Sequence, residues 1–154
     1  MKLSKKCEYA LRALTCLGAP ETPPVLSIQE IASQEHIPKK FLEQVLLALK
    51  KAGIVQSSRG KAGGYTLQRA PAGVSLGDIV RAVDGPLTPL PCASLTAPVK
   101  CPDCPRVETC WLRAVMIEVG EGIASVLDQI TLVDLCRRVA QSQRRGMQAL
   151  MYEI

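Results

Sequence analysis

The sequence predicts a mainly α-helical fold with one small β-hairpin, and three patterns carry this prediction. Residues 28–34 and 39–52 show helical spacing and are separated by a short turn. Two short segments of alternating apolar and polar residues follow at once, around a glycine-rich stretch, which is typical of a hairpin. Apolar residues then recur at helical spacing from residue 112 to 130, which indicates one long helix. Together the patterns predict a winged helix-turn-helix followed by a long C-terminal helix.

The first helix is expected to start after Ser4, whose hydroxyl can cap it, and to run to about Leu17. Gly18 and the prolines that follow it end the helix. Cys7 and Cys16 lie on this helix and are expected to be small buried hydrophobic residues. The apolar face is predicted to contain Tyr9, Ala10, Ala13, Leu14 and Leu17.

The helix-turn-helix candidate begins with the sequence from Ser27 to Glu30, which has the pattern of a capping box. Pro38 suits the first position of the second helix, and Gly53 suits the position just after its end. His36 falls in the turn and is expected to be a surface residue. The inward side chains of the second helix are predicted to be Leu42, Val45, Leu46 and Leu49.

The hairpin is predicted from residues 54–58 and 65–69, which flank the basic, glycine-rich tip at 59–64. The tip is not a P-loop, because it lacks the required order of glycines and leads into no helix. A helix of this kind fits the major groove of DNA, and Arg59 could reach a narrow minor groove. In the major groove, Glu43 could accept from cytosine and Gln44 could pair with adenine. The predicted DNA-binding residues are Lys39, Lys40, Glu43, Gln44, Arg59, Lys61 and Gly63.

The second half of the chain is predicted to contain three further helices. Ser75 and Asp78 cap a short one over residues 76–83, and Thr131 caps the last, which is expected to end in a mobile tail around residues 144–146. The long helix between them carries an aliphatic stripe that a small chain can cover best with a second copy of itself. The predicted dimerisation residues are Leu112, Val115, Met116, Val119, Ile123 and Leu127.

Composition and charge restrict the class of protein. A chain of 154 residues is about one domain, and 47% hydrophobic residues excludes wholesale disorder. Residues 1–70 carry eleven Lys or Arg against five Asp or Glu, whereas residues 71–154 carry eight against nine. Only the first half is therefore expected to bind a polyanion. No secretory signal or membrane-length apolar run is recognisable, so the expected location is the cytoplasm, where thiols stay reduced.

Four of the seven cysteines lie between residues 92 and 110, in the spacing Cys-x8-Cys-x2-Cys-x5-Cys. Prolines within this stretch exclude a regular helix. Soft thiolates gathered in a loop favour an iron–sulfur cluster, but a zinc site and a thiol redox switch without metal are left open. The spacing matches neither standard ferredoxin pattern, and only Cys101 and Cys104 form a zinc-type knuckle.

The order of these features resembles the family of winged-helix iron–sulfur transcriptional regulators that includes IscR, NsrR and RirA. The resemblance covers essentially the whole chain. It is carried by Met1–Ser4, Ile37–Gln44, Arg59–Tyr65, Ser75–Pro86, Cys104–Arg113 and Leu127–Leu135.

This resemblance implies an iron–sulfur cluster, either [2Fe-2S] or [4Fe-4S], held by Cys92, Cys104 and Cys110. The first gap is longer than usual in the family, so Cys101 could replace Cys92 or add to it. Where the IscR branch has a histidine ligand this chain has Arg113, and Glu8 stands where the NsrR branch uses an acid from the partner subunit.

The family also implies a homodimer on a pseudo-palindromic DNA operator, with residues 1–72 binding DNA and residues 73–154 sensing and dimerising. Enzyme activity is not implied. Two alternatives remain: the same fold acting through bare thiols or zinc, and an iron–sulfur electron carrier. The carrier is disfavoured because it gives the basic half and the wing no purpose.

Overall fold

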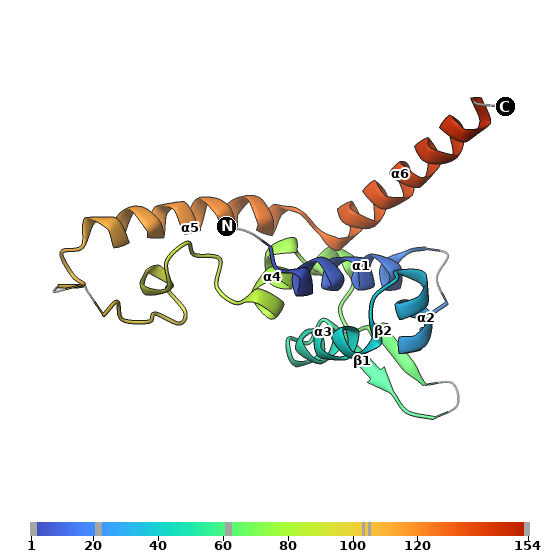
Figure 1. Cartoon of the computed structure of the whole chain (residues 1–154), viewed down its shortest axis with the longest axis horizontal. Coiled ribbons are helices and arrows are strands. Elements are labelled where there is room, and N and C mark those ends of the chain that lie inside the picture. Colours follow the sequence, from blue (N-terminus) through green and yellow to red (C-terminus); the bar gives the residue numbers. More distant parts are fainter. Residues whose placement is uncertain (1–2, 21–22, 61–62, 103, 105, 153–154) are drawn as a thin grey trace.

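The computed structural model describes residues 3–20, 23–60, 63–102, 104 and 106–152, with side chains as far as residue 145. It confirms the predicted class, a mainly helical chain with one antiparallel hairpin (Figure 1). The helices are α1 (Lys5–Gly18), α2 (Ile28–Gln34), α3 (Lys39–Lys51), α4 (Leu76–Asp84), α5 (Trp111–Gln129) and α6 (Leu132–Tyr152). The strands are β1 (Val55–Ser58) and β2 (Gly64–Leu67), and short 3-10 turns occupy Pro71–Gly73 and Pro91–Ala93.

Helix α1 begins where the sequence predicts, because the Ser4 hydroxyl accepts from the backbone N–H of Cys7 at 3.0 Å. The backbone N–H of Ser4 also donates to Asp84 at the end of α4, at 3.0 Å. Cys7 is completely buried and Cys16 is 8% exposed, so both are core residues as expected. These contacts fix α1 as the central helix, with α3, α4 and α6 packed around it.

Helices α2 and α3 form the predicted helix-turn-helix. The capping box of α2 is present, with Ser27 N–H donating to Glu30 at 2.7 Å and Glu30 N–H donating to Ser27 at 3.2 Å. His36 is exposed in the turn and adopts a positive φ of 51°. Pro38 caps α3 from outside rather than forming its first turn, since its ψ of 126° is extended. Gly53 has a φ of 67° and closes α3 in the way that glycine allows.

The hairpin pairs Val55 with Leu67 and Ser58 with Gly64, so β2 starts and ends earlier than the sequence suggested. Tyr65 of β2 also has a backbone partner outside the hairpin. Tyr65 N–H donates to the carbonyl of Leu26 at 2.7 Å, and Leu26 N–H returns a bond of 3.1 Å. A side chain at Gly64 would collide with that carbonyl, so the backbone approach requires glycine.

Two aliphatic clusters hold the elements together. The main cluster fills the space between α1, α3 and the hairpin, and it takes in Val74, Ile79 and Leu132 from beyond residue 72. The second is smaller and contains Cys7, Val80 and Leu87, against which one edge of α5 packs. The DNA-binding candidates and the long helix are therefore linked through α1 and α4.

Helix α5 lies above α4 in Figure 1, and the cysteine loop occupies its far end. Its other end joins α6 through a bridge in which Leu76 N–H donates to Ile130 at 2.7 Å and Leu132 N–H donates to Val74 at 2.8 Å. Helix α6 then points away from the body. The predicted tail at residues 144–146 was wrong, because the helix continues to Tyr152. Arginines are good helix formers, and one glycine costs only about 1 kcal/mol.

Within the described ranges, none of the helices has both the length and the apolar character needed to cross a membrane.

Candidate nucleic-acid interface and cysteine cavity

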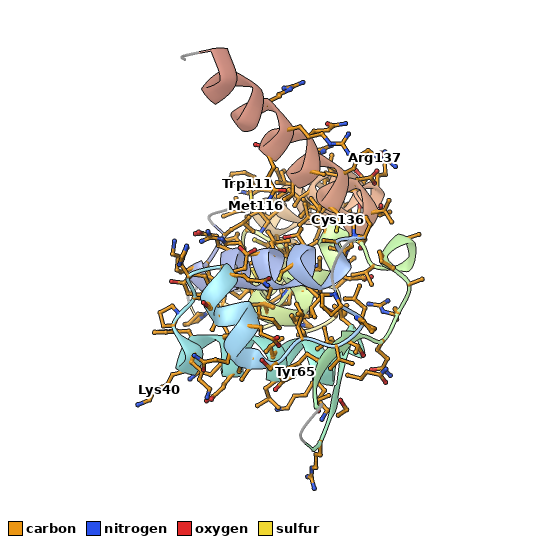
Figure 2. The ribbon with its side chains drawn as sticks, turned by 90° about the vertical axis from the view of Figure 1, so that its right-hand side faces the viewer. Lys40, Tyr65, Trp111, Met116, Cys136 and Arg137 are labelled. Carbon is orange, nitrogen blue, oxygen red and sulfur yellow. The ribbon has the colours of Figure 1, made fainter. Side chains whose placement is uncertain are left out.

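One face of α3 is exposed along its whole length. Leu42, Val45, Leu46 and Leu49 are fully buried, which turns the opposite row outward. That row contains Lys40, Gln44, Leu47 and Lys51, with Lys39 and Glu43 at its edge, and all six are exposed. Figure 2 shows Lys40 extending from the side of the molecule on which the hairpin projects. The helix thus presents cationic, amide and carboxylate groups together, as a major-groove reader requires.

The wing carries Arg59 on its exposed tip, beside Gly60 with a φ of 106°. Gly63 N–H donates to the Gly60 carbonyl at 3.0 Å and closes the turn. A Cβ at Gly63 would lie 2.5 Å from the Ser58 carbonyl oxygen, so this position accepts no side chain. Gly63 therefore shapes the turn that presents Arg59. Lys61, also predicted to contact DNA, lies outside the described residues.

Sequence reasoning missed two large apolar side chains on α3. Phe41 is 55% exposed and meets the ring of Tyr9 edge to face, with centroids 6.4 Å apart. Leu47 is 54% exposed and lies in the middle of the outward row. The signal was available, because the four inward positions of α3 were already filled by other aliphatic residues.

All four cysteines of the loop line one cavity of about 310 Å³ at the N-terminal end of α5. Two bonds fold the loop back on itself: Val99 N–H donates to Pro91 at 3.2 Å, and the Arg113 side chain donates to the Cys92 carbonyl at 3.0 Å. The remaining walls are largely apolar. They are formed by Leu90, Pro91, Val99, Lys100, Pro102, Val107, Leu112 and Arg113.

The thiols of Cys104 and Cys110 differ in acidity. Cys110 caps α5 and makes no full side-chain capping bond, but the N–H groups of Arg113 and Leu112 face its sulfur. These groups, the thiol of Cys104 and the Arg113 charge lower the pKa of Cys110. Desolvation raises the pKa of Cys104, and so does its interaction with the Cys110 side chain; the Cys104 thiol donates to the Arg106 carbonyl at 3.4 Å. The two shifts are opposite in sign, so Cys110 is the more readily ionised thiol of the pair.

The donor set suits an iron–sulfur cluster or zinc in chemistry, since it offers soft sulfur ligands in an apolar cavity. The side chains, however, stand further apart than a bound metal ion requires. Among the described residues, no three or more Cys, His, Asp or Glu side chains converge closely enough to hold a metal ion. Glu8, the alternative ligand, is not among the cavity residues and pairs with Lys5 at 2.8 Å. The bond from Lys5 lowers the pKa of Glu8.

The predicted dimerisation stripe on α5 is divided in two. Ile123 and Leu127 pack against the small cluster of their own chain, and Met116 is half-buried. The other edge stays uncovered, and we call it the free stripe: Leu112 is 40% exposed, Val115 42%, Val119 41% and Val126 60%.

A two-armed ion pair joins α5 to α4. Arg81 donates from both terminal nitrogens to the two carboxylate oxygens of Asp128, at 2.8 and 2.7 Å. The bond lowers the pKa of Asp128. Gly77 lies directly beneath, where a Cβ would collide with the Asp128 carboxylate. The two helices therefore meet at a fixed point.

A helix-turn-helix with an exposed reading face, a wing and a sensor-like cysteine loop defines the class of winged-helix DNA-binding regulators. The sequence profile of the Rrf2 family, described as "Iron-dependent Transcriptional regulator", matches residues 3–138. The chain belongs to the Rrf2 family and is a transcriptional regulator.

Individual relatives agree with this assignment. An Rrf2-like HTH-type transcriptional regulator of Rhodobacter capsulatus is 43% identical over 136 residues, covering 86% of this chain and 91% of the relative. The structure of CymR, the global cysteine regulator of B. subtilis, superposes with a TM-score of 0.66 at 31% identity, covering 90% of this chain and 98% of CymR. The structure of T. potens IscR gives 0.67 at 30% identity, covering 93% and 91%.

Proposed function

We propose that this regulator binds a pseudo-palindromic operator as a homodimer and that an iron–sulfur cluster in the cysteine cavity sets its affinity for DNA. Residues 1–72 contact DNA through α3 and the wing, and residues 73–154 sense and dimerise. Because the proposed partner is DNA, the proposed location of the protein is the cytoplasm. No catalytic role is assigned to any residue.

The observation that carries the cluster is that Cys92, Cys101, Cys104 and Cys110 line one cavity. Cys104 and Cys110 are the core ligands, because both line the cavity at the start of α5 and the lowered pKa of Cys110 eases the loss of its proton that iron binding requires. Cys92 is the third. Cys101 lies in the same cavity and is preferred over Glu8, which only a partner subunit could supply. Iron bound there would draw the thiolates together and add a redox- or nitric-oxide-sensitive centre.

The test is anaerobic reconstitution of single alanine variants, followed by iron analysis and visible absorption spectra. Cys104→Ala and Cys110→Ala should lose the visible band and most of the iron. Cys136→Ala is the matched control, because Cys136 is half-buried on α6 outside the loop, and it should keep both. If Cys101→Ala is silent and Glu8→Ala removes the band, the fourth ligand is the cross-subunit carboxylate. A parent protein that never binds iron, or four silent cysteine variants, rejects the cluster.

A second candidate is a metal-free thiol switch, favoured by the direct contact of Cys104 with Cys110 and by the absence of three converging ligands in the described part of the chain. A peroxide-class oxidant would take two electrons from the two thiols, giving one disulfide and two waters. Peroxide treatment of iron-free protein, followed by thiol counting and DNA-binding assays, separates this candidate from the first.

A further inference from the structure

The outward row of α3 has an exposed leucine, Leu47, with a lysine toward each end of the row. Leu47 lies one turn beyond Gln44 on the outward row, between Lys40 and Lys51. It belongs to neither hydrophobic cluster, and its side chain is 54% exposed. Together with Lys6, Gln44 and Lys51 it lines a shallow hollow between α3, α1 and α4.

A single exposed leucine is common on protein surfaces, so only its surroundings can indicate a function for Leu47. Ammonium groups that surround an apolar side chain repel the basic surfaces of another copy of this chain. They match the major groove of DNA, where thymine exposes a C5-methyl group between two rows of phosphates. The row therefore suits the major groove: its lysines can contact phosphates while Leu47, between them, contacts a base.

We infer that Leu47 reads the methyl group of a thymine in each operator half-site, within two base pairs of the one that Gln44 contacts. Residues three apart on a helix face lie about 5–6 Å apart, which is less than two base-pair steps of about 3.4 Å each. Phe41 does not take this role, because its ring leans on Tyr9 at the flank of the helix. This inference rests on the proposed DNA-binding function and adds a specificity residue to it.

The experiment selects a preferred operator from random DNA with the full-length protein, then replaces each thymine in turn by deoxyuridine, which lacks only the methyl group. Removing one contacted methyl group should weaken binding about fourfold, which corresponds to about 0.8 kcal/mol per buried carbon group. Replacing the equivalent thymine in both half-sites should weaken it about fifteenfold. Leu47→Ala should lose this methyl sensitivity while keeping the unfolding temperature of the parent, because the side chain is exposed.

Two control variants make the result specific. Phe41→Ala removes the other exposed apolar side chain of α3 and should retain the full deoxyuridine effect. Lys40→Ala should weaken binding to all sequences and reduce the salt dependence, again with the methyl effect intact.

Each failure has its own meaning. A parent protein without sequence preference for DNA rejects the proposed function and this inference with it. Sequence preference without any methyl-sensitive thymine, or a Leu47→Ala variant that keeps the effect, rejects this inference alone. A change of oligomeric state in Leu47→Ala with unaltered methyl sensitivity would make Leu47 a protein contact and also reject it.

Discussion

Placing a charge in the free stripe of α5 gives the sharpest test of the dimer. Val119 is 41% exposed and lies at the centre of the stripe, one helical turn from Val115. Complete burial of a valine or leucine side chain is worth about 1.5–3 kcal/mol, so covering the remaining exposed part is worth about 0.6–1.2 kcal/mol. Val119→Glu removes this gain and places a carboxylate in an apolar contact.

A two-fold interface contains every residue twice, so the loss doubles to about 1.2–2.4 kcal/mol. Two carboxylates cost several kcal/mol each when fully buried, and about 2 kcal/mol each at an edge that water can still reach. The total is about 5–6 kcal/mol, or about four powers of ten in the dissociation constant. A dimer of nanomolar affinity would then dissociate at micromolar concentration.

Sedimentation velocity at about 1–10 μM measures this directly. Val119→Glu should sediment as a folded monomer, because the substituted side chain is exposed in the single chain. Ser125→Glu puts the same charge on the same helix, at an exposed position outside the stripe, and should sediment like the parent. A folded Val119→Glu dimer of unchanged affinity would refute the assignment of the free stripe as the interface.

Three further predictions concern the DNA contacts and the buried thiols. Arg59→Ala should weaken binding roughly tenfold at operators with a narrow A·T-rich minor groove, and less at G·C-rich operators. Fluorescence-anisotropy titrations measure both losses. Equal losses at the two kinds of operator would show that the wing does not enter the minor groove. Glu43→Ala should bind non-specific DNA as well or better while relaxing base preference by about 1–3 kcal/mol at one position, whereas a uniform loss in a binding-site selection would make Glu43 structural. Burial, aided by the carboxylates of Asp84 and Glu35, raises the pKa of Cys7 and of Cys16 from 9.0 to about 11. The unfolded chain releases these protons first, so the free energy of unfolding should fall as pH rises from about 9 through 11 in urea titrations, and Cys7→Ala should reduce that fall.

The local signals were reliable because caps act over three or four residues. Ser4, Ser27, Ser75 and Thr131 all cap the helices that the sequence assigned to them. Local patterns do not show which distant backbone pairs with a strand. The limits of β2, which its pairing with β1 sets, were misplaced, and the pairing of Leu26 with Tyr65 was not foreseen.

The candidate sites also divide into local features that the sequence predicts and long-range features that it does not. Periodicity reveals that α5 has a wide apolar arc, but it cannot tell which edge packs on its own chain, and so Ile123 and Leu127 were grouped with the free stripe. Cysteine spacing could not show that Cys92 and Cys101 open into the same cavity as Cys104 and Cys110. That arrangement depends on the backbone bond from Val99 to Pro91, which the proline-rich sequence does not predict.

The ion pair between Arg81 and Asp128 has a thermodynamic consequence. It joins α5 to α4, and α4 packs on both α1 and α3, so a series of packed helices connects Cys110 with the exposed face of α3. Linkage between two sites is reciprocal. If the state of the cysteine loop changes operator affinity by some factor, operator DNA changes the equilibrium of the loop by the same factor. Under the proposed function an operator would therefore also be an effector, and the protein bound to a promoter would have a different oxidation or iron-binding midpoint from the protein free in solution.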